Sequence, residues 1–143
     1  MSEDNKTLAR HIFDEVWGAT DVNKVDKYFA ANFVTHPELP GMPQGSAGVK
    51  AQVSMYAGAL SDAHNAIEDL FAEGDKVVIR WSATAKQTGE FAGIPATGKQ
   101  FKTTAITIYR FKDGKVVEGW TEYNSLEMMQ QLGVVPALAP AVG

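Results

Sequence analysis

The first third of the chain carries apolar residues at the spacing of amphipathic helices. The first series is Leu8, Ile12, Phe13 and Val16. It predicts a helix from residue 3 to about residue 17, which Gly18 ends. A second, shorter helix is expected to begin after Asp21, because its carboxylate can accept hydrogen bonds from the first turn. A third helix is predicted over residues 49–60. Its shared face consists of Val49, Val53, Tyr56 and Leu60.

The second half of the chain changes to the two-residue alternation typical of β-strands. The stretches with this pattern, rich in β-branched and aromatic residues, are residues 65–72, 76–87, 99–112 and 115–123. Glu73-Gly74-Asp75 joins the first pair and Asp113-Gly114 joins the last pair. Asp-Gly favours a tight hairpin because both of its residues tolerate positive φ. A final short helix, residues 126–132, is expected to end at Gly133.

Proline and glycine mark the segments that are expected to be irregular. They are concentrated in residues 37–48 and 88–98, and a short extended piece, Phe33-Val34, precedes the first of these loops. Residues 1–135 are expected to form one domain, and the Ala/Pro-rich residues 136–143 a flexible tail. Three N-terminal helices followed by long antiparallel strands predict an α+β fold. In such a fold a curved sheet wraps around a helix and encloses a pocket.

Composition and charge exclude several classes of function. The chain has 143 residues, 45% of them apolar and 21% charged, which fits one soluble domain. Its net charge is −4 and its basic residues are scattered, so we expect no nucleic-acid surface. The absence of cysteine excludes disulfides, thiolate catalysis and Cys-ligated zinc. No apolar run reaches the roughly 18 residues that span a membrane, and the polar start is unlike a signal peptide. We therefore expect no membrane association and a cytoplasmic location.

Few residues carry chemistry that stands out on its own. No histidine pairs with another at metal-ligand spacing, so the sequence predicts no metal site. His64 lies two residues from Asp62, which could hold one imidazole tautomer for acid/base work; the alternative is a solvated loop histidine. Tyr56 brings a hydroxyl onto an apolar helical face, and we expect it to line the pocket.

Three local patterns are together specific to one protein family. They are Phe33-Val34-Thr35-His36, the loop from Thr88 to Lys99, and the ending from Val117 to Gly133. These patterns resemble the SnoaL-like polyketide cyclases of the nuclear-transport-factor-2-like superfamily. The resemblance implies a cone-shaped α+β fold with a ligand cavity between sheet and helices, and a homodimer formed through the sheet. It also implies cofactor-free aldol closure of polyketide ester rings, with a carboxylate as the acid/base. His36 matches a position at the mouth of the family's pocket.

Two positions depart from the family pattern. Asn124 stands where a catalytic Asp usually follows the tryptophan, here Trp120, and Gln87 stands where a His is common. An amide has no titratable proton in the useful range, so Asn124 cannot act as a general base. It could orient a ligand carbonyl or a water. Alternatively, Asn124 caps the last helix.

The resemblance implies that the Trp120 side of the last strand faces the cavity. Strand alternation then places Glu118 and Glu122 on the same side. Either glutamate could supply the carboxylate that position 124 lacks, with a pKa raised by apolar surroundings. The alternative is that both are paired with Arg80 or Arg110 on neighbouring strands, or lie in solvent.

Three functions stay open on this reading. The first is a cofactor-free enzyme acting by acid/base chemistry on a small carbonyl compound that is hydrophobic or aromatic. Its catalytic residues would be Glu122, His36 and Asn124, and its binding residues Trp120, Tyr56, Glu118, His64 and Arg80. The second is a binding module with the same pocket and no turnover, which the loss of the Asp favours. The third is epoxide hydrolysis, in which Arg80 would join an Asp–Arg–Asp set. It ranks last because position 124 has no carboxylate.

Overall fold

The computed structural model describes residues 2–38, 41–91 and 93–136 of the chain. The α-helices are α1 (Ser2–His11), α2 (Val25–Tyr28), α3 (Ser46–Ala59) and α4 (Ser125–Leu132). The strands are β1 (Phe29–His36), β2 (Leu60–Glu73), β3 (Lys76–Gln87), β4 (Gln100–Lys112) and β5 (Lys115–Tyr123). A π-helical turn, η1 (Ile12–Gly18), continues α1, and a 3-10 turn, η2 (Val22–Lys24), precedes α2. Of the expected tail, residues 137–143 lie outside the described residues.

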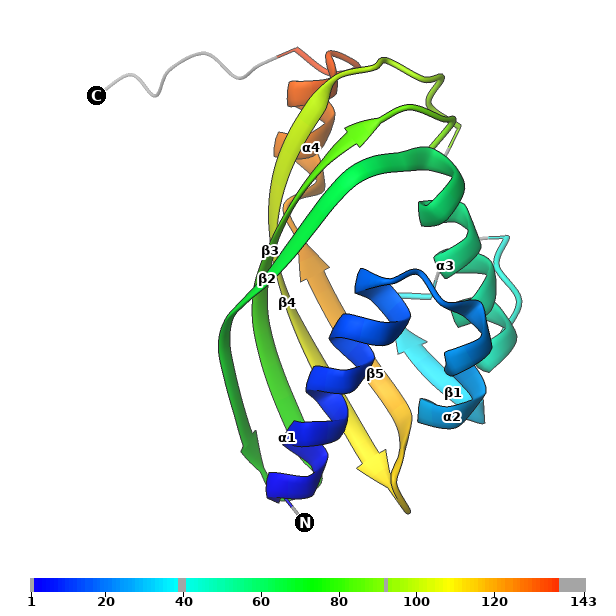
Figure 1. Cartoon of the computed structure of the whole chain (residues 1–143), viewed down its shortest axis with the longest axis vertical. Helices are drawn as coiled ribbons and strands as arrows, with labels where there is room; N and C mark the ends of the chain where they lie inside the picture. Colours follow the sequence, from blue (N-terminus) through cyan, green and yellow to red (C-terminus); the bar gives the residue numbers. More distant parts are fainter. Residues whose placement is uncertain (1, 39–40, 92, 137–143) are drawn as a thin grey trace.

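The strands form one five-stranded sheet in the order β1-β5-β4-β3-β2. Neighbouring strands are antiparallel, except that β1 runs parallel to β5. Figure 1 shows the sheet curving along one side of the molecule, with α1 and α3 on its inner side. The predicted α+β fold with a curved sheet is confirmed. The sheet stays open, because β1 and β2 are edge strands that do not pair with each other.

Local signals in the sequence set most of the element ends. The Asp21 carboxylate accepts a hydrogen bond from the backbone N–H of Asn23 and so caps η2, as predicted. Gly133 ends α4 with a φ of 80°, also as predicted. Three starts differ from the sequence expectation by three residues or more, and one of them is β1, which begins at Phe29 rather than Phe33. α3 begins at Ser46 rather than residue 49, and β2 begins at Leu60 rather than residue 65.

The core lies between the inner face of the sheet and the helices. Ile12 and Val16 of η1 are fully buried and belong to the same cluster as Val77 of β3 and Phe29 of β1. Burial of one such side chain stabilises the fold by about 1.5–3 kcal/mol relative to exposure. A second cluster, around Phe101 of β4, packs the helix α4 against the far end of the sheet.

Strand alternation gives the sheet two chemically different faces. We call the side that packs on α1 and α3 the inner face, and the opposite side the outer face. Across β3, β4 and β5, one inner-face row is Ile79, Thr107 and Thr121. The adjacent outer-face row is Val78, Ile108 and Trp120. In the part of the chain that the structure describes, no helix is long and apolar enough to cross a membrane.

Candidate functional site

A cavity of about 440 Å³ lies between the inner face of the sheet and the helices. Trp17 of η1 and Tyr56 of α3 line its helical side, while Thr107, Tyr109 and Thr121 line its sheet side. Most of the other lining residues are apolar or aromatic. The volume falls within the roughly 300–1,000 Å³ typical of small-molecule sites. The cavity can therefore hold a compact organic ligand.

Two tryptophans fix the hydroxyl groups on the sheet side of the cavity. The indole N–H of Trp17 donates a hydrogen bond to the Tyr109 hydroxyl oxygen, 3.1 Å away. The indole N–H of Trp81 donates to Thr107 Oγ1 over 3.0 Å, and this oxygen lies 3.0 Å from Thr121 Oγ1. An indole N–H can only donate, so Tyr109 and Thr107 must be the acceptors in these bonds.

Two of these hydroxyl protons remain available for donation to a ligand. Each hydroxyl carries one proton. The Tyr109 oxygen accepts from Trp17, and no described residue accepts the Tyr109 proton. Thr107 and Thr121 share one hydrogen bond, so one of their two protons also lacks an acceptor within the described residues. Tyr109 and Thr107 are only 7% and 5% exposed, and Thr121 lines the cavity with them, so both unused protons lie at the cavity.

Burial keeps the cavity tyrosines protonated. It raises the pKa of Tyr109 to about 12, with a partly opposing effect from the Trp17 hydrogen bond. Burial also raises the pKa of Tyr56, above the usual value of a phenol. The neutral form of a phenol is the form that donates a hydrogen bond. Both hydroxyls are therefore donors throughout the neutral pH range.

Tyr56 lies where the sequence placed it, in the cavity lining. Its hydroxyl accepts a hydrogen bond from Gln52 Nε2 over 3.2 Å, one turn earlier in α3. Its ring meets the Trp17 ring edge-on at 6.0 Å and stacks on the Phe91 ring at 5.7 Å. These contacts hold the hydroxyl in one place, which a ligand-positioning group requires.

The expectation that Trp120 faces the cavity is wrong. Gly119, Thr121 and Tyr123 of β5 line the cavity. Because side chains alternate along a strand, Glu118, Trp120 and Glu122 point to the outer face. The physical reason is close packing at Gly119, where a Cβ would lie only 3.2 Å from the rings of Phe33 and Tyr109. The inner side of β5 is thus filled by these two rings at position 119, where a side chain would crowd them.

Glu118 belongs to an outer-face polar cluster, as the paired alternative predicted. Its carboxylate lies 2.8 Å from His36 Nε2 and accepts a hydrogen bond from Arg110 Nε over 3.0 Å. The His36 ring stacks on the Trp120 ring at 5.3 Å. The hydrogen bonds from His36 and then from Arg110 hold the pKa of the Glu118 carboxyl below its usual range. Although His36 is also among the lining residues, its imidazole is thus engaged on the other face of the sheet.

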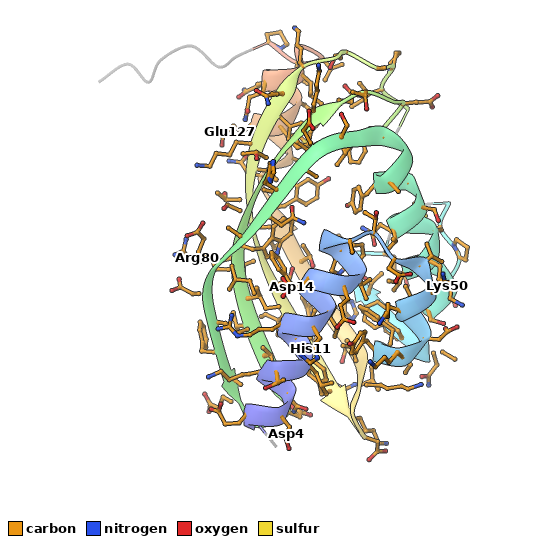
Figure 2. All side chains as sticks on the ribbon, in the orientation of Figure 1. Asp4, His11, Asp14, Lys50, Arg80 and Glu127 are labelled. Carbon is orange, nitrogen blue, oxygen red and sulfur yellow. The ribbon has the colours of Figure 1, made fainter. Side chains whose placement is uncertain are left out.

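The remaining expected site residues also lie away from the cavity. Arg80 pairs with Asp69 over 2.6 Å, and Figure 2 shows it projecting outward, away from the helices. His64 is exposed and lies opposite Thr84 on the edge of the sheet, without a hydrogen bond to Asp62 in the described structure. Glu122 is exposed on the outer face. These residues therefore do not converge on one site.

Position 124, the site of the family's usual catalytic carboxylate, is the N-cap of α4 in this chain. The Asn124 side-chain oxygen accepts a hydrogen bond from the backbone N–H of Glu127. The other departure, Gln87, is fully buried and holds the loop between β3 and β4. Its amide donates to the carbonyls of Ile94 and Pro95 and accepts from the Thr97 hydroxyl. Both departures therefore have structural roles.

Sequence reasoning missed most of the cavity's polar groups. Among them are Thr107, Tyr109 and Thr121, and Asp62 was considered only as a partner of His64. Alternation over residues 99–112 and 115–123 does place Thr107, Tyr109 and Thr121 on matching faces, so a signal was present. Within residues 2–38, 41–91 and 93–136, no three His, Asp or Glu side chains gather as metal ligands would.

Sequence comparison identifies the family. The model of the SnoaL-like polyketide cyclases matches residues 7–132. The chain belongs to the SnoaL-like polyketide cyclase family. A search of curated protein sequences found no match.

Solved structures similar to this SnoaL-like protein have the same fold. TsrD from Streptomyces laurentii is 28% identical with a TM-score of 0.85, over 93% of this chain and 97% of that one. AclR from Streptomyces galilaeus, a proposed hydroxylase, is 26% identical with a TM-score of 0.81, over 97% and 87% of the two chains. A proposed polyketide cyclase from Acidithiobacillus ferrooxidans is 32% identical with a TM-score of 0.77, over 92% and 95%.

Proposed function

We propose that this SnoaL-like protein binds a neutral, carbonyl-bearing, largely apolar small molecule and rearranges it by acid/base chemistry without a cofactor. The observation that carries the proposal is the pair of buried hydroxyl protons, at Tyr109 and at Thr107–Thr121, that lack acceptors among the described residues. A ligand carbonyl oxygen supplies the missing acceptor. The apolar and aromatic lining suits a ring system, since such surfaces bury hydrocarbon without unpaired polar groups.

The same donors favour chemistry next to the carbonyl. Removal of a proton from the neighbouring carbon moves negative charge onto the carbonyl oxygen. Donors that already point to that oxygen stabilise the charge more in the transition state than in the ground state. A neutral hydroxyl serves this purpose while it stays protonated, and burial raises the pKa of Tyr109 to about 12, above the neutral range. The family's ring-closing aldol reaction begins with such a proton removal, which makes a cyclase-type enzyme the favoured function.

A binding module without turnover is the second candidate. It is favoured by one observation, that position 124 holds an amide engaged in capping α4. Epoxide hydrolysis by an Asp–Arg–Asp set has less support, because Arg80 pairs with Asp69 on the outer face.

A homodimer through the outer face is part of this proposal. Phe71 of β2, Ile106 of β4 and Val34 of β1 are 56%, 47% and 46% exposed on that face. Large apolar side chains that remain exposed on one face of a sheet favour burial against a partner. A second copy of the same chain would cover them in an isologous contact.

Tryptophan fluorescence tests ligand binding directly, because Trp17 and Trp81 line the cavity and Trp120 does not. We expect 2-tetralone, a bicyclic aromatic ketone, to change the emission in a saturable way. The Trp120→Phe variant should keep this response, while Trp17→Phe should reduce it. A linear, non-saturable response in the wild type would contradict the proposal.

A further inference from the structure

We propose that Asp62 is the carboxylate that takes and returns the proton in this cavity, in place of the aspartate missing at position 124. The inference rests on the proposed function, and it identifies a catalytic residue on β2 rather than on β5. Three features of Asp62 carry it: its place in the cavity lining, the β-bulge with its unusual backbone conformation, and its lack of a partner among the described residues.

A β-bulge directs Asp62 to the inner face. Ser61 pairs with Lys86 and His64 pairs with Thr84, so Asp62 and Ala63 together stand opposite the single residue Ala85. Two residues opposite one is the defining pattern of a β-bulge. Ala85 lines the cavity, and Asp62 and Ala63 line it too. Without the extra residue, regular alternation would not hold both of them at the cavity.

The backbone of Asp62 is in a conformation that side chains rarely adopt. Its φ is 50°, in the left-handed region, which is unfavourable for a residue with a Cβ. Glycine usually occupies this position of a bulge. Unfavourable backbone conformations persist where the surrounding structure enforces them, and they concentrate at functional sites. Aspartate is one of the few residues other than glycine that tolerate this region, so the bulge can present a carboxylate here.

Asp62 is available for proton transfer. It is the only carboxylate among the described residues that line the cavity. No described residue forms a hydrogen bond or ion pair with its side chain. The carboxylates of the outer-face cluster and of the Arg80 pair, in contrast, are engaged by cations. Asp62 is also exposed, so it stands at the mouth of the cavity, where it can exchange protons with water.

The proton balance of the reaction closes without any added reagent. The Asp62 carboxylate removes a proton from the carbon next to a ligand carbonyl, and the C–H electron pair moves into a C=C bond as the carbonyl oxygen becomes an enolate. The Tyr109 hydroxyl and the Thr107–Thr121 pair are the donors for that oxygen. The enolate carbon then attacks a second carbonyl of the same molecule and forms the ring C–C bond. The new alkoxide takes the proton back from Asp62, so the net change is an isomerisation.

Proton exchange isolates the first half of this reaction and needs no knowledge of the natural substrate. In D₂O, base-catalysed enolisation replaces the hydrogens next to the carbonyl of 2-tetralone with deuterium, which proton NMR follows. We expect the wild-type chain to accelerate this exchange above the buffer rate. In Asp62→Asn the exchange rate above buffer should fall by at least about 10²-fold, as expected for removal of a general base.

The variants keep folding and ligand binding separate from catalysis. Asparagine tolerates the left-handed region well, so Asp62→Asn should retain the bulge. Asp62→Gly has no Cβ and relieves the conformation, so it should be at least as stable and equally inactive. Glu122→Gln removes an exposed carboxylate of the outer face and should exchange at the wild-type rate. Fluorescence titration with 2-tetralone should give unchanged binding for Asp62→Asn.

The possible results distinguish this inference from the proposed function. Exchange that survives in both Asp62 variants overturns the role of Asp62 and leaves the proposed function standing. Binding of 2-tetralone to the wild type without any exchange above buffer overturns both the role of Asp62 and the acid/base half of the proposed function, and it favours the binding module. If the wild type does not bind 2-tetralone, the proposed function fails first and the role of Asp62 fails with it.

Discussion

Asn124 and Glu127 form a reciprocal pair at the start of α4. The Asn124 side-chain oxygen accepts from the Glu127 backbone N–H over 3.1 Å, and the Asn124 amide donates to the Glu127 carboxylate over 2.7 Å. Figure 2 shows Glu127 beside α4, on the outside of the molecule. The first bond satisfies an N–H group that the helix itself cannot pair. The amide at the position of the family's usual carboxylate therefore stabilises a helix.

Replacement of Asn124 should change stability and leave the cavity intact. Asn124→Ala removes the cap and is expected to lower the free energy of unfolding by about 0.5–2 kcal/mol. Asn124→Ser, which can still cap, should lose less. Chemical denaturation measures both, and 2-tetralone exchange should stay at the wild-type rate. Asn124→Asp should gain no activity; a clear gain would show that position 124 reaches the ligand after all.

Gly119 makes room for two rings under the cavity. An added Cβ would lie 3.2 Å from Phe33 Cζ and 3.2 Å from Tyr109 Cδ1, closer than normal packing allows. We expect Gly119→Ala to lower the free energy of unfolding by about 1–3 kcal/mol through overpacking, and to weaken 2-tetralone binding because the Tyr109 ring must move. Gly58→Ala is the matched control. Its Cβ meets nothing within 4 Å, and alanine in a helix is favoured over glycine by roughly 0.5–1 kcal/mol.

The outer-face cluster predicts a pH-dependent contribution to stability. His36 and then Arg110 hold the pKa of Glu118 below its usual value. A carboxylate with a lowered pKa stabilises the folded state above its unfolded-state pKa, and the contribution is lost as the pH falls through the folded-state pKa. Glu118→Gln should therefore be less stable than wild type at neutral pH, and the difference should shrink in acid. Urea midpoints over a pH series measure this effect.

A second variant controls the interpretation of the acid series. Arg110→Met removes one of the two groups that hold the Glu118 pKa down, so it should keep only part of the pH dependence. A stability difference for Glu118→Gln that stays constant from neutral pH to well below the usual carboxyl pKa would contradict the linkage argument.

The proposed dimer gives a prediction about mass. Ile106 is 47% exposed in the middle of the outer face. Ile106→Lys should convert a dimer to a monomer, because an isologous contact would bring the two lysines close together. Light scattering at micromolar concentration measures the mass of both proteins. A monomeric wild type would refute the dimer.

The fold could be predicted from the sequence because its signals are local. Asp113-Gly114 specifies a hairpin by itself, and Gly133 ends α4 in the left-handed conformation that its position required. The parallel pairing of β1 with β5 has no local signal, since it joins segments about eighty residues apart. The early start of β2 was missed because its first residues, from Ser61 to Asn65, are mostly polar and contain the bulge.

The site was harder to predict because alternation does not tell which face of a strand is inside. Both faces of β5 carry aromatic residues, Trp120 on one and Tyr123 on the other. The choice of face came from the resemblance and was wrong for this chain. The bulge at Asp62 depends on the pairing of β2 with β3 and on one backbone angle, neither of which hydrophobic periodicity contains. The cavity residues can therefore be identified only once the pairing of the strands is known.

The most direct test of the account is a binding cycle on Tyr109. Dissociation constants are measured for 2-tetralone and for tetralin, the hydrocarbon without the carbonyl, on the wild type and on Tyr109→Phe. Tyr109→Phe should bind the ketone about 3- to 10-fold more weakly, which matches the roughly 0.5–1.5 kcal/mol of one hydrogen bond, and should bind tetralin as the wild type does. Equal losses for both ligands, or no loss for the ketone, would contradict the claim that the cavity recognises a carbonyl oxygen through its unused hydroxyl protons.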